Sequence, residues 1–131
     1  MAGSPAYIAP EVFRSKVYDS KADIYSLGIM LWEIWYGQQA FSKIVFLELE
    51  DFFRKVVDSG CRPEHLEDHM DPPPCWQELM KDCWQPMPEK RPTAKQCHER
   101  VLYFFLGLTI TDSKVFANVN WCMVSINKIN E

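Results

Sequence analysis

The sequence predicts a mainly α-helical fold, in which a bundle of helices surrounds one buried central helix. The first observation is a long apolar segment at residues 23–36. Wound as an α-helix, this segment places apolar side chains on every side, which is typical of a helix that is buried all round. The second observation is that apolar residues recur at helical spacing within residues 49–57, 76–83 and 97–105. These stripes predict further helices that pack around the central one.

The sequence marks both the start and the end of the central helix. Ser20 stands three residues before Asp23, the spacing of a capping box, and Gly37 can adopt the left-handed conformation that closes a helix. Fourteen residues correspond to about 21 Å of helix, and a bilayer requires about 20 apolar residues. We therefore expect the segment to cross a small domain and not a membrane.

Composition indicates one globular domain or a large piece of one. The chain has 131 residues, of which 47% are hydrophobic and 24% charged, and its net charge is −4. This balance gives no electrostatic footprint for nucleic acid or anionic lipid, and the first residues lack the pattern of a secretory signal. Five cysteines without a C-x-x-C pair indicate buried thiols in a reducing compartment. We expect a soluble, cytoplasmic protein with no nucleic-acid or membrane partner.

The first segment of the chain contains an ordered motif. Pro5 prevents regular structure, and Pro10 can begin a short helix that carries Glu11. Residues 3–11 read Gly-Ser-Pro-x-Tyr-x-Ala-Pro-Glu. This stretch resembles the end of the activation segment of protein kinases, where an Ala-Pro-Glu motif follows the activation loop.

Two further motifs follow at compatible separations. Residues 23–28 resemble the D-x-Y/W-S-x-G opening of the central helix of the kinase large lobe, and residues 31–34 resemble its continuation in tyrosine and tyrosine-kinase-like groups. Residues 83–92 resemble the family's C-W-x-x-x-P-x-x-R-P stretch. The resemblance implies that residues 1–106 are a partial large lobe of a protein kinase. Residues 107–131 depart from the family, and we expect a poorly ordered or foreign extension there.

The resemblance implies a substrate-positioning role for residues 4–7. Ser4 matches a hydroxyl that bonds into the catalytic loop of Ser/Thr kinases, and Pro5, Ala6 and Tyr7 match the loop that receives the substrate residue after the acceptor. Ser4 also reads locally as a turn-former before a proline. The motif favours Ser/Thr specificity, and the tryptophans favour the tyrosine-kinase-like branch. Dual specificity stays open.

The resemblance also implies structural roles for three charged residues. Glu11 and Arg91 match the two ends of a buried ion pair, which would tie the end of the activation segment to the C-terminal helices. Asp23 matches a residue that accepts backbone N–H groups of the catalytic loop, although here it can serve simply as a carboxylate at the start of a helix.

The sequence contains none of the family's catalytic motifs. Kinases hold ATP and Mg²⁺ with a glycine-rich loop, a strand lysine, a catalytic-loop Asp and Asn, and a D-F-G Asp, all of which precede Ala-Pro-Glu. No G-x-G-x-x-G, H-R-D or D-F-G is present. ATP and Mg²⁺ are therefore implied for the full-length family, while this chain offers no catalytic, cofactor-binding or metal-binding residue.

Two functions of different class follow. In the first, the chain is part of a Ser/Thr protein kinase that acts on protein substrates, and it is inactive on its own. In the second, it is a non-catalytic module that binds kinase-associated proteins through surface that the rest of a kinase would cover. An in-frame H-R-D and D-F-G upstream of Met1 would favour the first, and a genuine start at Met1 the second.

The remaining patterns favour structural roles. Cys61, His65 and His69 could share a helical face as metal ligands, but Pro63 interrupts the spacing and solvated loop residues are the better interpretation. His98 stands alone and is read as structural. We interpret the acidic residues Glu48, Glu50 and Asp51 as the solvated face of an exposed helix. We interpret the apolar stripe of residues 49–57 as a face that packs on the core rather than a docking surface.

Overall fold

The computed structural model describes residues 5–15, 18–42, 48–106 and 128, and these residues contain helices and no β-strand. The helical elements are, in order, η1 (Pro5–Tyr7), α1 (Pro10–Ser15), α2 (Ser20–Tyr36), α3 (Leu49–Phe52), η2 (Phe53–Asp58), α4 (Pro74–Cys83), η3 (Pro88–Lys90) and α5 (Ala94–Leu106). The prediction of a mainly α-helical fold is confirmed. The expected extension at residues 107–131 lies outside the described residues, apart from Lys128.

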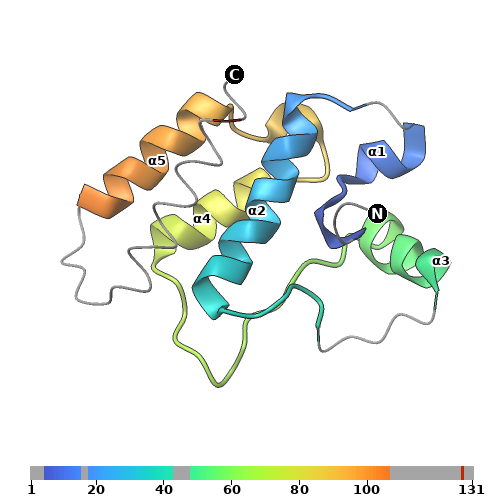
Figure 1. The fold of residues 1–131 in the computed structure, drawn as a ribbon, viewed down its shortest axis with the longest axis horizontal. Helices are drawn as coiled ribbons and strands as arrows, with labels where there is room; N and C mark the ends of the chain where they lie inside the picture. The colour runs from blue at the N-terminus through green and yellow to red at the C-terminus, as the bar shows by residue number, and fades with distance from the viewer. Residues whose placement is uncertain (1–4, 16–17, 43–47, 107–127, 129–131) are drawn as a thin grey trace.

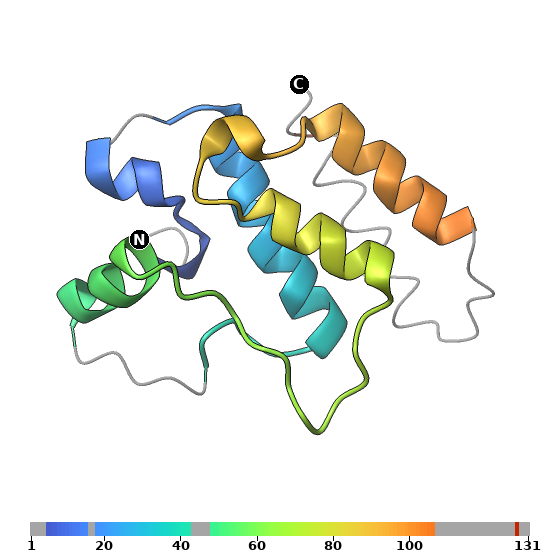
Figure 2. The same cartoon turned by 180° about the vertical axis from the view of Figure 1, so that it is seen from behind.

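Helix α2 is the centre of the fold. In both views α4 and α5 lie on one side of it and α1 and α3 on the other (Figure 1, Figure 2). Most of its apolar side chains are buried, and Ile24, Tyr25, Leu27, Ile29 and Leu31 are each at most 1% exposed, while Met30, Ile34 and Trp35 are half-buried. A helix in contact with neighbours on both sides needs apolar residues all round, as the sequence predicts.

The start of α2 differs from the prediction. Asp19, not Ser20, is the N-cap: its backbone is extended, and its carboxylate accepts hydrogen bonds from the backbone N–H groups of Lys21 (2.9 Å) and Ala22 (3.2 Å). Ser20 already belongs to the helix, because the aspartate one residue earlier caps it equally well. The C-terminal prediction is confirmed, since Gly37 has φ 66° and its N–H donates to the carbonyl of Glu33 at 2.8 Å.

Helices α4 and α5 form as predicted. The face of α4 that carries Trp76, Leu79, Met80 and Cys83 is buried. The capping box before α5 is present with both of its bonds: the backbone N–H of Gln96 donates to the Thr93 hydroxyl at 3.1 Å, and the Thr93 N–H donates to the Gln96 side chain at 2.9 Å. On α5, Cys97, Val101 and Phe104 face the core.

The stripe in residues 49–57 forms two elements instead of one regular helix. One turn of α-helix, α3, passes into a π-helical segment, η2, in which the Ser59 N–H donates to the carbonyl of Arg54. Phe52, Val56 and Val57 are buried, so most of the stripe packs on the core, while Leu49 is 61% exposed. Apolar periodicity marks the buried face, but it does not distinguish a π-turn from an α-turn.

Gly28 sets the close approach of α2 and α4. A Cβ atom at this position would lie 2.9 Å from Cys83 Cβ and 3.1 Å from the Met80 carbonyl oxygen and the Trp84 backbone nitrogen. Two of these three atoms are backbone, so the helices themselves would have to separate. Overpacking costs about 1–3 kcal/mol, and the better helix propensity of alanine returns at most about 1 kcal/mol.

We therefore expect Gly28→Ala to lower the free energy of unfolding by up to about 2 kcal/mol in urea titrations. Gly60→Ala is the matched control, because Gly60 has φ 72° and nothing within 4 Å of its Cβ position. Its loss of about 1–2 kcal/mol comes from backbone strain alone and should leave the helix packing, followed by tryptophan fluorescence, unchanged. A Gly28→Ala chain that is more stable than the natural one would contradict the close approach.

Candidate functional site

The segment matched to substrate positioning lies against α2. Pro5–Tyr7 form the single turn η1, closed by the Ile8 N–H, which donates to the Pro5 carbonyl at 3.1 Å. Ala6 is buried and Tyr7 is half-buried. Ser4 lies outside the described residues. The structure therefore places three of the four predicted positions in one short turn on the central helix.

Tyr7 is held to α2 at both ends. The Ser26 hydroxyl donates to the Tyr7 carbonyl at 2.6 Å, and the Tyr7 hydroxyl donates to the carboxylate of Glu33. The second carboxylate oxygen of Glu33 accepts the backbone N–H of Ala40 at 2.8 Å. Burial and the neighbouring Glu33 carboxylate raise the pKa of Tyr7 to about 12. Sequence reasoning placed Tyr7 but missed Glu33, since nothing in the apolar segment marks that residue as its partner.

The raised pKa of Tyr7 gives a pH-dependent prediction. The folded chain keeps the tyrosine proton to about pH 12, whereas an unfolded chain loses it near 10.0, so stability falls as the pH rises between these values. At neutral pH we expect Tyr7→Phe to cost about 1–2 kcal/mol for the lost charge-assisted bond. The difference in the free energy of unfolding between the natural chain and Tyr7→Phe should be smaller at about pH 11, because only the natural chain loses the stabilisation by the Tyr7 hydroxyl.

Urea titrations of both chains at the two pH values check this prediction. Tyr25, whose pKa burial also raises, is present in both chains, so its contribution cancels in the comparison. A difference that stays constant or grows with pH would contradict the Tyr7–Glu33 bond.

Glu11 and Arg91 lie together in the structure. Arg91 Nη1 donates to Glu11 Oε1 at 2.7 Å and Nη2 to Oε2 at 2.8 Å, the two-pronged geometry of a strong guanidinium–carboxylate pair. The Arg91 side chain is 0% exposed and that of Glu11 23%. Arg91 also donates to the backbone carbonyls of Gln85 (2.7 Å) and Lys21 (2.9 Å). The pair therefore joins α1, the start of α2 and the connection between α4 and α5.

A second arginine completes the polar interior. Arg62 and Arg91 lie over the ring of Tyr25, with their guanidinium carbons 5.1 Å and 5.2 Å from its centroid. Burial lowers the pKa of Arg62 and raises that of Tyr25. Arg62 donates to the carbonyls of Trp84 and Val56. Its partners are backbone carbonyls, which carry no residue signature, so sequence alone does not separate it from a solvated arginine.

Asp23 lies in the first turn of α2 and accepts a hydrogen bond from the hydroxyl of Tyr18. Burial raises the pKa of its carboxyl group. Asp19, not Asp23, bonds to the backbone N–H groups at this helix end. The negative charge of Asp23 nonetheless stands at the favourable end of the helix dipole.

The candidate metal ligands have other contacts. Among the described residues no group of three or more metal-ligating side chains comes together. His65 pairs with Asp71 at 2.6 Å, and His69 with Asp68 at 2.8 Å. The Tyr36 hydroxyl lies 3.1 Å from His65 Nδ1. The two ion pairs lie within the loop between η2 and α4, and the Tyr36 contact attaches this loop to the C-terminal end of α2.

The indole groups of α2 hold the same loop. Trp32 Nε1 donates to the Glu64 carbonyl at 2.9 Å, and Trp35 Nε1 donates to that of Met70 at 2.8 Å. A loop without regular structure must satisfy its backbone carbonyls with other groups, and these side chains supply the donors.

The expectation of buried cysteines is correct only in part. Cys83 and Cys97 are buried, but Cys61 is half-buried and Cys75 is exposed; Cys122 lies outside the described residues. Cys75 is exposed because it falls outside the apolar face that begins at Trp76. No helix within the described ranges is long and apolar enough to cross a bilayer.

The other polar candidates lie on or near the surface. Glu48 and Glu50 are exposed, Asp51 is half-buried and contacts Lys55 at 3.4 Å, and His98 is half-buried on α5.

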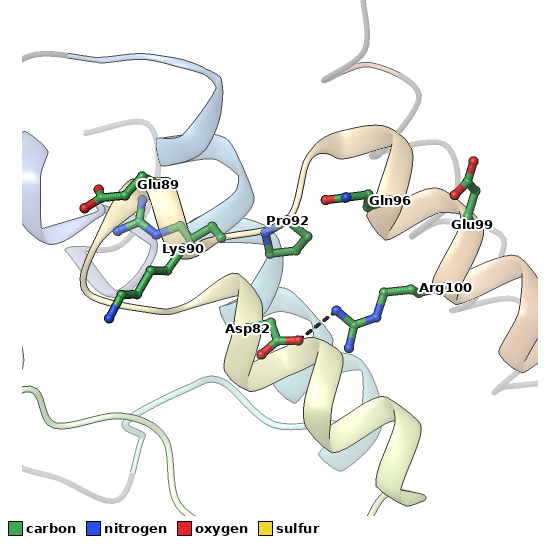
Figure 3. A pocket seen from close by; sticks show the side chains of 8 residues that line it. Asp82, Glu89, Lys90, Pro92, Gln96, Glu99 and Arg100 are labelled. Atoms are coloured by element: carbon green, nitrogen blue, oxygen red, sulfur yellow. Dashed lines mark hydrogen bonds and ion pairs between the residues drawn. The ribbon is translucent and has the colours of Figure 1, made fainter.

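A polar cavity of about 530 Å³ lies between α4, η3 and α5 (Figure 3). Its lining carries both signs of charge and includes Asp82, Glu89, Lys90, Glu99 and Arg100. Across it, Arg100 donates to Asp82 at 2.8 Å. The carboxylates of the lining offset its cations, so the cavity presents no concentrated charge of one sign.

Comparison with known proteins identifies the family. The model of the protein tyrosine and serine/threonine kinase family matches residues 2–101. The dual specificity protein kinase shkA of Dictyostelium discoideum is 36% identical over 94 residues, which cover 70% of this chain and 16% of that protein. The mitogen-activated protein kinase kinase kinase mom-4 of Caenorhabditis elegans is 36% identical over 104 residues, which cover 79% of this chain and 18% of that protein.

A third relative is the probable serine/threonine-protein kinase roco5 of Dictyostelium discoideum, 36% identical over 105 residues that cover 76% of this chain and 4% of that protein. The chain thus spans less than a fifth of the length of each of these three relatives. The matched region takes in η1, the Glu11–Arg91 pair and the central helix. The chain belongs to the protein tyrosine and serine/threonine kinase family.

Proposed function

We propose that this chain is the substrate-side part of an ATP-dependent protein kinase that phosphorylates Ser/Thr residues of protein substrates, with dual specificity left open. The observation that carries the proposal is the attachment of η1 to α2. Tyr7 bonds to α2 through its carbonyl and its hydroxyl, and α1 directly after it is fixed by the Glu11–Arg91 pair. A loop held in this way presents a fixed surface to the substrate residue that follows the acceptor.

Phosphoryl transfer in this family depends mainly on positioning and charge stabilisation. ATP and Mg²⁺ supply the phosphoryl group and neutralise its charge when they are bound by the family's nucleotide-binding and catalytic motifs, which this sequence does not contain. The role of this chain is therefore to position the protein substrate: Pro5, Ala6 and Tyr7 form the receiving surface, Ser4 contributes its hydroxyl, and Asp23 anchors the start of the central helix. On its own the chain is inactive.

The experiment starts from the transcript that encodes the chain. We expect an in-frame H-R-D and D-F-G upstream of Met1, and we expect the longer protein to transfer labelled phosphate from Mg·ATP to Ser/Thr peptides. The present chain, assayed in parallel, should transfer none. In the longer protein, Tyr7→Ala should raise the KM for the peptide several-fold and leave the KM for ATP unchanged. An unchanged peptide KM would contradict the positioning role.

The second candidate is a non-catalytic interaction module, and exposed apolar side chains on α5 favour it. Tyr103 is 82% exposed and Leu102 39%. Large exposed apolar side chains are typical of surfaces that bind other proteins when they form a contiguous patch. A transcript with a stop codon directly upstream of Met1, together with a chain that folds alone, would favour this candidate over the kinase assignment.

A further inference from the structure

Two thiols from different helices meet in the core. Cys83 is the last residue of α4, and Cys97 lies in the first turns of α5. Both residues are 0% exposed. Their sulfur atoms are 3.7 Å apart and share a hydrogen bond in which either thiol can be the donor. Neither residue belongs to the substrate-side surface.

The surroundings of Cys97 favour its thiolate. Cys97 lies near the N-terminal end of α5, where the helix dipole favours negative charge, while Cys83 lies at the C-terminal end of α4, where the dipole opposes it. The hydrogen bond from Cys83 lowers the pKa of Cys97, and the positive charges of Arg100 and Lys21 add to this effect against the opposing effect of burial. Cys97 is therefore the better nucleophile, and Cys83 is the adjacent thiol that can react with an oxidised Cys97.

The backbone around Cys83 is tightly packed. The Cβ atom of Cys83 faces Gly28 across the contact of α2 and α4, where no Cβ on residue 28 would fit without displacement. A disulfide bond is about 2.05 Å long, so the sulfur atoms must approach by about 1.7 Å from their present separation. The two helices already hold the sulfurs in van der Waals contact.

We propose that Cys83 and Cys97 form a reversible disulfide when local opening of the contact between α4 and α5 admits a small hydroperoxide to Cys97, which is 0% exposed in the closed structure. The Cys97 thiolate attacks one peroxide oxygen, the O–O bond breaks, and Cys97 becomes a sulfenic acid while hydroxide or alkoxide leaves. The Cys83 sulfur then attacks the Cys97 sulfur, the S–O bond breaks, and water leaves. Two thiols are oxidised and one peroxide is reduced, so no further co-reactant is needed.

The disulfide would act on the Glu11–Arg91 pair. The loop that it closes, residues 83–97, contains Arg91 and the carbonyls of Gln85 and Pro86 that accept from this arginine. Closing the loop reduces the conformational freedom of the unfolded chain, which favours the folded state. The oxidised protein should therefore keep this loop, and Arg91 with it, folded to a higher temperature than the reduced one.

The test uses the full chain, first with all five cysteines present and then with Cys61, Cys75 and Cys122 replaced by serine. Each protein is treated with hydrogen peroxide, blocked with an alkylating reagent and digested with trypsin. We expect peptides 82–90 and 96–100 to be linked, with a mass lower by two hydrogens than their sum. Dithiothreitol should separate them, and the oxidised protein should show a higher Tm than the reduced one.

Single variants separate the two steps. Cys83→Ser should stop the reaction at a sulfenic acid on Cys97 that dimedone traps, whereas Cys97→Ser should leave Cys83 unoxidised under the same conditions. Circular dichroism establishes that each protein is folded. Unlinked peptides from a folded, peroxide-treated chain would overturn the proposal, whether Cys97 remained a thiol or advanced to a sulfinic acid. An oxidised chain with an unchanged Tm would overturn the effect on the Arg91 loop.

Discussion

Replacing Glu11 with alanine is expected to lower the free energy of unfolding by about 3–5 kcal/mol, measured by urea titration at neutral pH. The reason is the burial of its partner, since the Arg91 side chain is 0% exposed. Without the Glu11 carboxylate, a guanidinium charge stays in the interior with backbone carbonyls and the Tyr25 ring as partners and no opposite charge beside it. The penalty is that of an uncompensated buried charge and not of a lost surface contact.

The Arg100–Asp82 pair supplies the matched control. It also joins an arginine to a carboxylate, at nearly the same distance of 2.8 Å, but its side chains are 34% and 45% exposed. Arg100→Ala should cost about 0–1 kcal/mol, because water screens both charges. Equal losses for Glu11→Ala and Arg100→Ala would show that the Glu11–Arg91 pair is no more important than a surface contact.

Trp76→Ala is expected to lower the free energy of unfolding by about 3–5 kcal/mol. Trp76 is 2% exposed, and its indole N–H donates to the Leu31 carbonyl of α2 at 3.2 Å. Its ring lies 6.0 Å from that of Trp35 and 5.0 Å from that of Phe104, centroid to centroid. One side chain thus joins α2, α4 and α5, and its removal leaves a cavity where the three helices meet. Thermal and urea unfolding measure the loss.

Two further variants provide stability losses with which the loss of Trp76→Ala can be compared. Trp76→Phe keeps most of the ring contact and loses the N–H donor, and we expect a cost of about 1–2 kcal/mol. Tyr103→Ala removes an aromatic ring of α5 that is 82% exposed, and the change should stay within about 0.5 kcal/mol. If Trp76→Ala were as mild as Tyr103→Ala, the assignment of Trp76 to the core would be wrong.

The sequence predicts those parts of the fold that depend on local chemistry. The capping box of Thr93 and Gln96 lies within four residues, and both of its bonds form. The left-handed Gly37 and the burial of most apolar residues of α2 also follow from short-range signals, although Met30, Ile34 and Trp35 are half-buried. The start of α2 was misplaced by one residue because Asp19 and Ser20 are both good N-caps, and only backbone dihedral angles distinguish them.

The contacts that sequence reasoning missed join residues that are distant along the chain. Glu33 meets Tyr7, Arg62 meets Trp84, and Cys97 meets Cys83 only once the helices have packed. No spacing rule reaches such partners, since each depends on the angle and separation of two elements. The Glu11–Arg91 contact is expected only from the resemblance of three motifs to one family. The structure adds the distance and the burial of the pair.

The separation of Glu11 and Arg91, 80 residues along the chain, sets when their contact can form. At about 5–20 residues per second, a ribosome needs roughly 4–16 s to add the residues between them, and the carboxylate of Glu11 remains solvated meanwhile. A contact of such high sequence separation closes late, after the helices have formed. Loss of Glu11 should therefore accelerate unfolding far more than it slows refolding, so the pair determines how long the folded protein lasts.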